Sequence, residues 1–227
     1  MSRTGPKASV CVVCGPTSAT LVTTKNDFRI VQCGTCGVLY VDGYTELTGL
    51  EEFYGSAYFS GRGNAVCGYR DYVGERRLHL RNAEALLSFV ERRLKGPGRR
   101  LLDVGCAHGF FLDAARARGW EVWGVDISAE AVQYARQELG LAVFRGHVDE
   151  CGLPPESFDV ICMIGTVEHF TDPMKAVRAS AHLLKREGLL LIATLDVEGR
   201  LGYFRWKPPE HLFYFSARSL SRLLGAA

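Results

Sequence analysis

The chain has 227 residues, which is room for one well-buried α/β domain and one small additional unit. Its hydrophobic fraction of 47% is that of an ordinary globular protein, and no apolar run approaches the roughly 20 residues of a membrane-spanning helix. The net charge of +2 is too small to favour nucleic acid. Because residues 1–9 lack the hydrophobic stretch of a secretory signal, we expect a cytoplasmic protein without a membrane partner.

Four of the eight cysteines form two C-x-x-C pairs, each followed by glycine: Cys11 with Cys14, and Cys33 with Cys36. Two intervening residues allow both thiolates of a tight turn to face one ion, and two such turns complete a tetrahedron. A closed four-sulfur site has no open coordination position, so the sequence predicts a structural Zn²⁺. Two disulfides, or four unrelated buried thiols, are the alternatives.

The segment between the pairs predicts a hairpin over Ala19–Val31 that turns at Asn26-Asp27. We therefore expect a zinc ribbon over residues 1–45. Residues 46–95 are predicted as a connector and helical cap, rich in aromatic residues and ending in a helix over 75–94. Those aromatic side chains either pack against the next domain or cap a ligand cleft there.

From Gly96 onward the pattern alternates between strands and helices, which predicts a Rossmann-like, doubly wound, mostly parallel sheet over residues 96–227. The predicted strands are 101–104, 121–125, 142–144, 158–164 and 189–194, and the predicted helices are 110–118, 129–139, 173–184 and 217–224. Ligands of such sheets bind beyond the carboxyl ends of the strands, so the residues at those ends are the candidates for a site.

The first two strands end in acidic residues around a glycine turn. Asp103 is followed by Gly105 and Gly109, a pattern that lacks the full G-x-G-x-x-G of dinucleotide sites and would repel a pyrophosphate. Asp126, about twenty residues further on, is placed to accept both hydroxyls of a ribose. The sequence therefore predicts an adenosine-type nucleoside without phosphates as the ligand.

These motifs support a named resemblance: residues 69–224 resemble class I S-adenosylmethionine-dependent methyltransferases. The similar segments are Leu101-Leu102-Asp103-Val104-Gly105-Cys106, Gly124-Val125-Asp126-Ile127-Ser128, Ser157-Phe158-Asp159-Val160-Ile161, Glu168-His169 with Asp172-Pro173, and Leu183-Leu184-Lys185-Arg186-Glu187-Gly188. The cysteine pairs followed by Phe53-Tyr54 and Tyr58-Phe59 are similar to a bacterial subgroup that acts in sugar, polysaccharide and secondary-metabolite pathways.

The resemblance implies S-adenosyl-L-methionine as cofactor and assigns its contacts. Asp103 would lie near the methionine ammonium, Gly105 and Gly109 along its path, Asp126 at the ribose, Ile127 and Val148 at the adenine, and Met163 would offer its backbone to the methionine moiety. Two positions depart from the family pattern: Ala107 replaces a middle glycine, and His147 replaces a commonly acidic residue. The two strands that the family adds after residue 224 are missing, so we expect a shortened sheet. Either the chain is a truncated form, or a partner or an alternative packing covers the exposed edge.

His169 and His211 both follow predicted strands, and each is a candidate general base, because histidine titrates near neutrality. Purely local hydrogen-bonding roles are the alternative for each. The sequence favours methyl transfer to a small-molecule acceptor, against a zinc-ribbon RNA methyltransferase and a non-catalytic binding or interaction module. The acceptor, the methylated atom and the oligomeric state stay open.

Overall fold

The computed structural model describes residues 8–47, 53–60, 68–198 and 206–227. The chain forms two compact units. The first unit contains residues 1–48, 167–177 and 194–227, and the second contains residues 49–166 and 178–193. No helix among the described residues is both long enough and apolar enough to cross a membrane. The domain boundaries expected from the sequence, after residues 45 and 95, stay predictions.

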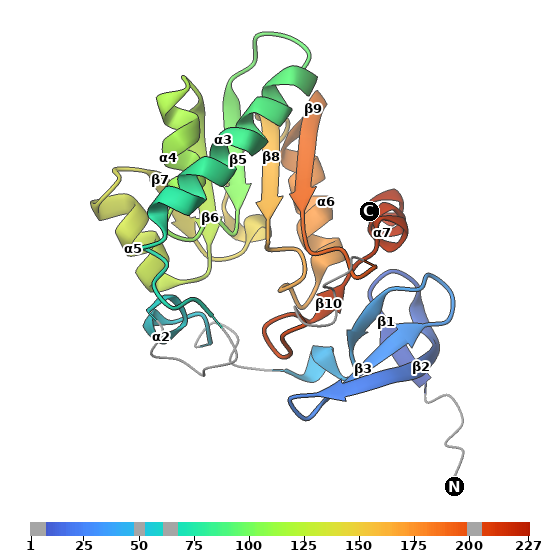
Figure 1. Ribbon diagram of the computed structural model, residues 1–227. Coiled ribbons are helices and arrows are strands. Elements are labelled where there is room, and N and C mark those ends of the chain that lie inside the picture. Colours follow the sequence, from blue (N-terminus) through green and yellow to red (C-terminus); the bar gives the residue numbers. More distant parts are fainter. Residues whose placement is uncertain (1–7, 48–52, 61–67, 199–205) are drawn as a thin grey trace, which may run out of the picture. The chain divides into compact units, whose positions relative to one another are not determined.

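The second unit contains a five-stranded parallel sheet in the order β7-β6-β5-β8-β9 (Figure 1). The strands are β5 (Arg100–Val104), β6 (Glu121–Asp126), β7 (Ala142–Arg145), β8 (Phe158–Ile164) and β9 (Leu184–Ala193). β5 and β8 lie at and beside the centre of the sheet and are almost entirely buried, as expected of parallel strands that are covered on both faces. This confirms the predicted fold class.

Amphipathic helices pack on this sheet: α3 (Arg76–Arg93), α4 (Phe110–Ala117) and α5 (Ala129–Gln137). Figure 1 shows α3 crossing the face of the sheet. Leu87 of α3 and Leu112 of α4 are fully buried in one core together with Leu101 and Val160 of the central strands. Burial of this apolar surface is the main force that holds the layers together, at roughly 25 cal/mol per Å².

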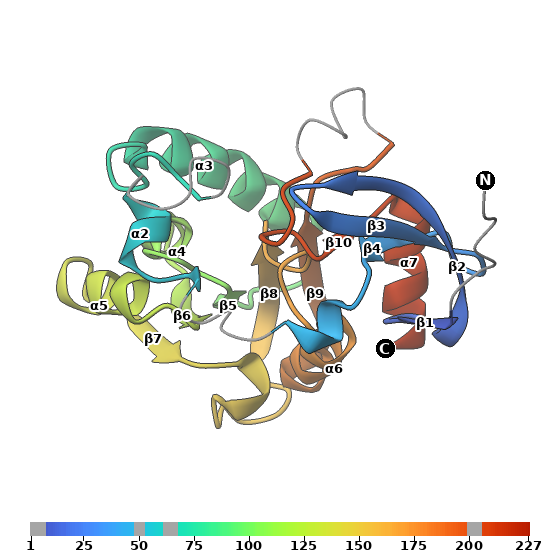
Figure 2. The same ribbon diagram turned by 90° about the horizontal axis from the view of Figure 1, so that it is seen from below.

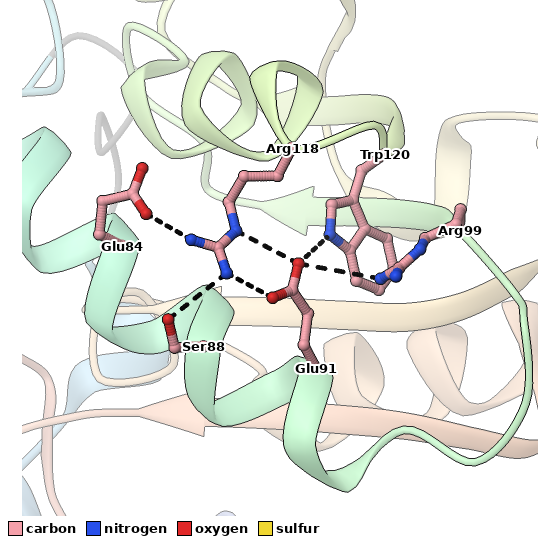
Figure 3. Close-up of polar contacts among 6 residues, drawn as sticks. All are labelled: Glu84, Ser88, Glu91, Arg99, Arg118 and Trp120. Atoms are coloured by element: carbon pink, nitrogen blue, oxygen red, sulfur yellow. Dashed lines mark hydrogen bonds and ion pairs between the residues drawn. The ribbon is translucent and has the colours of Figure 1, made fainter.

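A network of polar side chains fixes the amino end of the sheet, where β5 and β6 begin (Figure 3). Arg118 donates to Glu84 Oε2 at 2.5 Å and to both oxygens of Glu91, and Trp120 Nε1 donates to Glu91 Oε1 at 3.2 Å. Hydrogen bonds from Arg118 lower the pKa of Glu91. The network joins α3 to the turn between α4 and β6, and every charge in it faces an opposite charge or a donor.

The first unit contains an antiparallel sheet in the order β1-β2-β3-β4-β10. Its strands are β1 (Ala8–Cys11), β2 (Gly15–Lys25), β3 (Phe28–Cys33), β4 (Leu39–Val41) and β10 (Phe213–Tyr214), and a short η1 helix (Tyr44–Glu46) follows β4. Asn26 and Asp27 turn the hairpin with φ of 49° and 65°, a left-handed conformation that these two residue types tolerate well. The predicted hairpin and its turn are confirmed.

The C-terminal part of the chain completes this sheet, which the sequence did not predict. Phe213 and Tyr214 of β10 pair with Tyr40 and Leu39 of β4. Helix α7 (Ala217–Ala226) begins at a capping box and lies beside the sheet of the same unit (Figure 2). From this helix, Arg222 donates to the carbonyl oxygen of Thr35 at 2.6 Å.

Two shorter helices complete the set of elements, and the start of β9 differs from its predicted position. Helix α2 (Ser56–Phe59) lies in the aromatic connector, and α6 (Pro173–Leu183) precedes β9. β9 begins at Leu184, directly after α6, whereas the sequence predicts a strand only from residue 189. The polar run Lys185-Arg186-Glu187-Gly188 is typical of a loop, but parallel pairing with β8, through an irregularity between Phe158 and Val160, extends the strand over it.

Candidate cofactor and metal sites

The turn after β5 brings the chain close to the end of β8. Gly105 has a φ of 79°, and a Cβ atom there would lie 2.2 Å from Cγ2 of Thr166. Only glycine fits, because any side chain would meet Thr166 while occupying a left-handed conformation. The Gly105 and Cys106 amides both donate to the carbonyl oxygen of Val125, which ties this turn to β6.

Two further residues of this turn, Gly109 and Ala107, also have left-handed backbone conformations. Gly109, the N-cap of α4, has a φ of 82°, and a Cβ atom there would lie 2.5 Å from Leu141. Glycine at this position therefore allows Leu141 to pack closely against the start of α4. Ala107 also occupies the left-handed region, with φ of 46°. That conformation explains why a glycine is expected there, and the structure accommodates the extra methyl group of alanine.

Asp126 holds the two turns together at the end of β6. One carboxylate oxygen accepts from the Ala107 amide at 2.8 Å, and the other accepts from the Ser128 amide at 2.8 Å. A carboxylate offers about four lone-pair sites, so an acid at this position can accept from more than one donor at a time. Asp103 and Asp126 lie near each other, as predicted. Strands β5 and β6 are parallel neighbours, and each carries one of these residues near its carboxyl end.

Asp103 is a buried acidic side chain of the second unit with an oxygen atom that is unsatisfied within the described residues. It is only 3% exposed, and its Oδ1 has no hydrogen-bond partner among the residues that the structure describes. Burial, followed by the charge of Asp126, raises the pKa of Asp103 to about 8. A buried carboxyl group of this kind is costly unless a donor or a cation satisfies it, so the site fits a ligand that carries a positive charge.

The aromatic connector packs against the same turns. Tyr54, Tyr58 and Phe59 are buried in a cluster with Ala131, and the partly buried Ala107 and Ile127 contact it. The segment therefore covers the two turns that carry the predicted cofactor contacts. Of the two roles considered from sequence, packing against the α/β unit is observed, and a capping role over ligand stays a prediction.

His108 lies in the same turn, and its side chain is buried. It is 2% exposed, and its ring stacks on Tyr72 with centroids 5.0 Å apart and meets Phe59 edge to face at 4.7 Å. Burial, followed by the charge of His79, lowers the pKa of His108 to about 4. His108 is therefore a neutral part of the aromatic cluster, and its place inside the glycine turn gave no periodic signal of burial.

The other predicted cofactor residues lie at the same edge of the sheet. Val148 begins the η2 turn (Val148–Glu150) and is 5% exposed, while His147 before it is exposed. Met163 lies near the carboxyl end of β8 with a fully buried side chain. Their contacts with a cofactor stay predictions.

In the first unit, the four predicted cysteines form one cluster, with their sulfur atoms all within 4.8 Å of one another. Cys11 Sγ lies 3.5 Å from Cys36 Sγ, and Cys33 Sγ lies 3.9 Å from Cys14 Sγ. Four thiolates bound tetrahedrally to Zn²⁺ are about 3.8 Å apart, so the spacing fits this ion. Burial would raise the pKa of Cys33, but the Cys36 and Thr35 amides donate to its sulfur and lower that pKa to about 6.

The same unit brings together the two candidate histidines. The rings of His169 and His211 lie 4.9 Å apart, edge to face, and His169 Nδ1 lies 2.8 Å from the carbonyl oxygen of Glu210. Ligand atoms of Glu168, His169 and His211 are all within 4.8 Å. The sequence predicted a functional role for the two histidines but none for Glu168. The repeated dipeptides Glu168-His169 and Glu210-His211 are a signal that could have indicated it.

Comparison with known proteins identifies the family. Residues 75–227 match the sequence model of a family described as a methyltransferase domain. The chain belongs to this methyltransferase family. The match includes the whole parallel sheet and both acidic strand ends, and it agrees with the resemblance drawn from the motifs.

Curated relatives of this methyltransferase chain are named ubiquinone biosynthesis O-methyltransferases. The protein of Alkalilimnicola ehrlichii is 38% identical over 117 residues, which cover 48% of this chain and 47% of the relative. The protein of Xanthomonas campestris is 35% identical over 116 residues and 48% of each chain. The chain thus spans about half the length of the curated relatives it matches.

Solved structures share the fold of this methyltransferase. The YcgJ protein of Bacillus subtilis has a TM-score of 0.54 and 26% identity, covering 64% of this chain and 67% of that one. An S-adenosylmethionine-dependent methyltransferase of Archaeoglobus fulgidus has a TM-score of 0.56 and 21% identity, covering 68% and 72%. These likenesses support the Rossmann-like architecture of the second unit.

Proposed function

We propose that this chain is an S-adenosylmethionine-dependent methyltransferase for a small-molecule acceptor. The observation that carries the proposal is the buried carboxyl group of Asp103. Its Oδ1 lacks a partner among the described residues, and it lies near Asp126 at the carboxyl ends of neighbouring strands. A ligand with an ammonium group and ribose hydroxyls satisfies both residues. The family assignment supports the same cofactor.

In this proposal, Asp103 binds the ammonium of the cofactor, and Asp126 accepts hydrogen bonds from its ribose. Gly105 and Gly109 leave room along the turn, Ile127 and Val148 pack on the adenine, and the Met163 backbone contacts the methionine moiety. When bound, the cofactor supplies a methyl group already activated by a sulfonium. The task of the protein is then to hold acceptor and donor in line and to take up a proton where the acceptor has one to lose.

The acceptor class is proposed from two sources. The curated relatives are named for ubiquinone biosynthesis, which involves a small molecule. The cysteine pairs and the aromatic connector resemble the subgroup that acts on sugars, polysaccharide precursors and secondary metabolites, and we propose an acceptor of that kind. The net charge of only +2 does not favour RNA as the acceptor.

A direct test uses the purified wild-type chain. Calorimetry should show binding of S-adenosylhomocysteine but not of NAD, and a panel of sugar, phenol and metabolite acceptors should yield S-adenosylmethionine-dependent turnover. RNA added to the panel tests the alternative, whose binding would fall steeply with salt. Cofactor binding without turnover of any acceptor would favour the non-catalytic module instead.

One histidine of the pair is proposed as the general base, with His211 preferred. His211 is buried, and its Nε2 lies 3.8 Å from Oε1 of Glu210, a carboxylate placed to stabilise a protonated ring. His169 instead uses Nδ1 to donate to a carbonyl oxygen of the backbone, an interaction that suits orientation.

Substitution separates the two histidines. His211→Ala should retain the affinity for S-adenosylhomocysteine and lose roughly 10²–10⁴ in turnover, because a base acts in the chemical step. The matched variant His169→Ala should lose less. The opposite order would transfer the role to His169, and near-wild-type turnover in both would remove histidine base catalysis from the proposal.

We also propose that the four cysteines bind one structural Zn²⁺. Their sulfur spacing and the amide donors around Cys33 support this ion over a disulfide, since every sulfur lies near the others rather than in two bonded pairs. Cys33→Ala should lose the metal and the folding of the first unit, as seen by metal analysis and by loss of resolved amide signals from that unit. Freshly purified wild type without zinc would contradict the assignment.

A further inference from the structure

We propose that Glu168, His169 and His211 form a second site for a divalent transition-metal ion, independent of the cysteine cluster. Their ligand atoms lie within 4.8 Å of one another, which is the spacing that a common ion can bridge. Glu168 and His211 are buried, with exposed fractions of 4% and 6%. Among the described residues, this is one of two groups that could hold a metal, and all three side chains belong to the first unit.

The backbone fixes the relative positions of the three ligands. The amides of Leu212 and Phe213 both donate to the carbonyl oxygen of Glu168, at 2.8 and 3.2 Å. These bonds clamp the segment that carries Glu168 and His169 against the segment that carries His211. Because the ligands are already held before any ion arrives, little ordering entropy opposes binding.

A backbone acceptor orients the His169 ring as such rings are oriented in metal sites, and a carboxylate lies near the His211 ring without a hydrogen bond at that distance. His169 Nδ1 donates to the carbonyl oxygen of Glu210 at 2.8 Å, which places the lone pair of the neutral ring on Nε2. His211 has the carboxylate of Glu210 at 3.8 Å from its Nε2. A metal-binding histidine commonly donates its other nitrogen to a carbonyl or carboxylate in this manner, which fixes the ring and increases its basicity.

The buried carboxylate of Glu168 also favours a cation at this cluster. Glu168 Oε2 is buried and has no hydrogen-bond partner among the described residues, so an ionised side chain there is uncompensated. Two imidazoles and one carboxylate favour Zn²⁺, Co²⁺ or Ni²⁺ over Mg²⁺ and Ca²⁺, which prefer all-oxygen sites. Three protein ligands leave at least one coordination position open, unlike the closed cysteine site.

The consequence of this site rests on the proposed function, although metal binding itself does not. An ion held by both histidines takes the nitrogen lone pairs that a general base requires. Occupancy should therefore inhibit methyl transfer. The chain would then contain two kinds of zinc: a permanent ion on sulfur and an exchangeable ion on nitrogen and oxygen.

Cobalt is the probe for the test, because its visible absorption reports the ligand type. The full-length chain, with zinc retained on the cysteines, is titrated with Co²⁺ in the absence of cofactor and acceptor. We expect one further equivalent to bind, with ligand-field bands but without the thiolate charge-transfer band of a sulfur site. Dialysis and metal analysis should give two metals per chain.

Glu168→Gln and His211→Ala should each weaken this second equivalent at least tenfold while the zinc on sulfur stays in place. Glu168→Gln preserves shape, so circular dichroism should match wild type and exclude simple misfolding. His182→Ala, which removes an exposed histidine of α6, is the matched control and should bind the further equivalent of Co²⁺ as tightly as wild type does. Binding of no second equivalent by wild type, or equal loss in the His182 control, would overturn the site.

Activity separates this inference from the proposed function. With Co²⁺ bound, turnover should fall in proportion to occupancy and recover on chelation of the weaker ion. Full turnover at full occupancy would refute the inhibitory consequence and the histidine base, while the binding data decide the site on their own.

Discussion

The two ends of the parallel sheet treat acidic side chains in opposite ways. At the amino end, Glu91 is paired with Arg118 and Trp120, and its pKa falls because the ionised form is well satisfied (Figure 3). At the carboxyl end, Oδ1 of Asp103 has no donor within the described part of the chain, and the pKa of Asp103 rises to about 8. One end therefore stabilises the fold, whereas the other keeps an unsatisfied carboxyl group at the expense of stability, which is typical of a site that awaits a ligand.

The largest expected effect comes from breaking the carboxyl end at Asp126. Asp126→Ala removes acceptors that we assign to the ribose, worth roughly 2–4 kcal/mol together. Affinity for S-adenosylhomocysteine should fall on the order of a hundredfold in calorimetry. Because Asp126 also accepts from the Ala107 and Ser128 amides, a melting curve must accompany the measurement. Equal affinity in variant and wild type would remove Asp126 from the site.

Asp103→Asn should sharpen the contrast by raising stability while it abolishes cofactor binding. The pKa of Asp103 in the folded protein is about 8, above that of the unfolded chain, so its protonated form is favoured by folding. The stabilisation is complete below about pH 4 and is lost as pH rises towards 8. Asparagine mimics the protonated group and avoids this loss, so at pH 8 the ligand-free variant should be more stable by several kcal/mol.

Urea unfolding of wild type and Asp103→Asn at pH 4.5 and pH 8 measures this difference, which should be small at the lower pH and large at the higher. Other titrating groups are common to both proteins and cancel. A variant less stable than wild type at pH 8 would mean that Asp103 is satisfied in the ligand-free fold.

The smallest effect is expected at the amino end. Glu91→Gln keeps the size of the side chain but removes the charge that faces Arg118, and the partly exposed site limits the loss to about 1 kcal/mol. Denaturant midpoints should fall while the affinity for S-adenosylhomocysteine is unchanged. A change in cofactor affinity would show that the two ends are coupled, contrary to the comparison.

The elements that could be predicted from sequence are those with a strong local pattern. β8 was predicted at its observed bounds because Phe158–Ile164 is a nearly continuous apolar run, and the hairpin was predicted because Asn26-Asp27 suits a left-handed turn. The acidic strand ends were found because parallel topology places successive carboxyl ends at one edge. These features depend on a few neighbouring residues.

The remainder depended on contacts between distant segments. The two residues of β10 are too few to give a periodic signal, and their pairing with β4 joins positions far apart in the chain. The burial of His108 follows from rings supplied by Phe59 and Tyr72. Glu168 joins the histidine pair because the Leu212 and Phe213 amides hold its carbonyl oxygen, a bond that no motif encodes.

The pairing of β10 with β4 has a consequence for how the protein is made. Residues 39–41 leave the ribosome early, but their partners at 213–214 follow only after the whole parallel sheet has been synthesised, roughly 10–30 seconds later at about 5–20 residues per second. During that interval β4 is an unpaired edge with Leu39, Tyr40 and Val41 uncovered, a segment prone to wrong pairing between nascent chains. Early capture of zinc by the cysteines of the same sheet would keep the three preceding strands in register until β10 arrives.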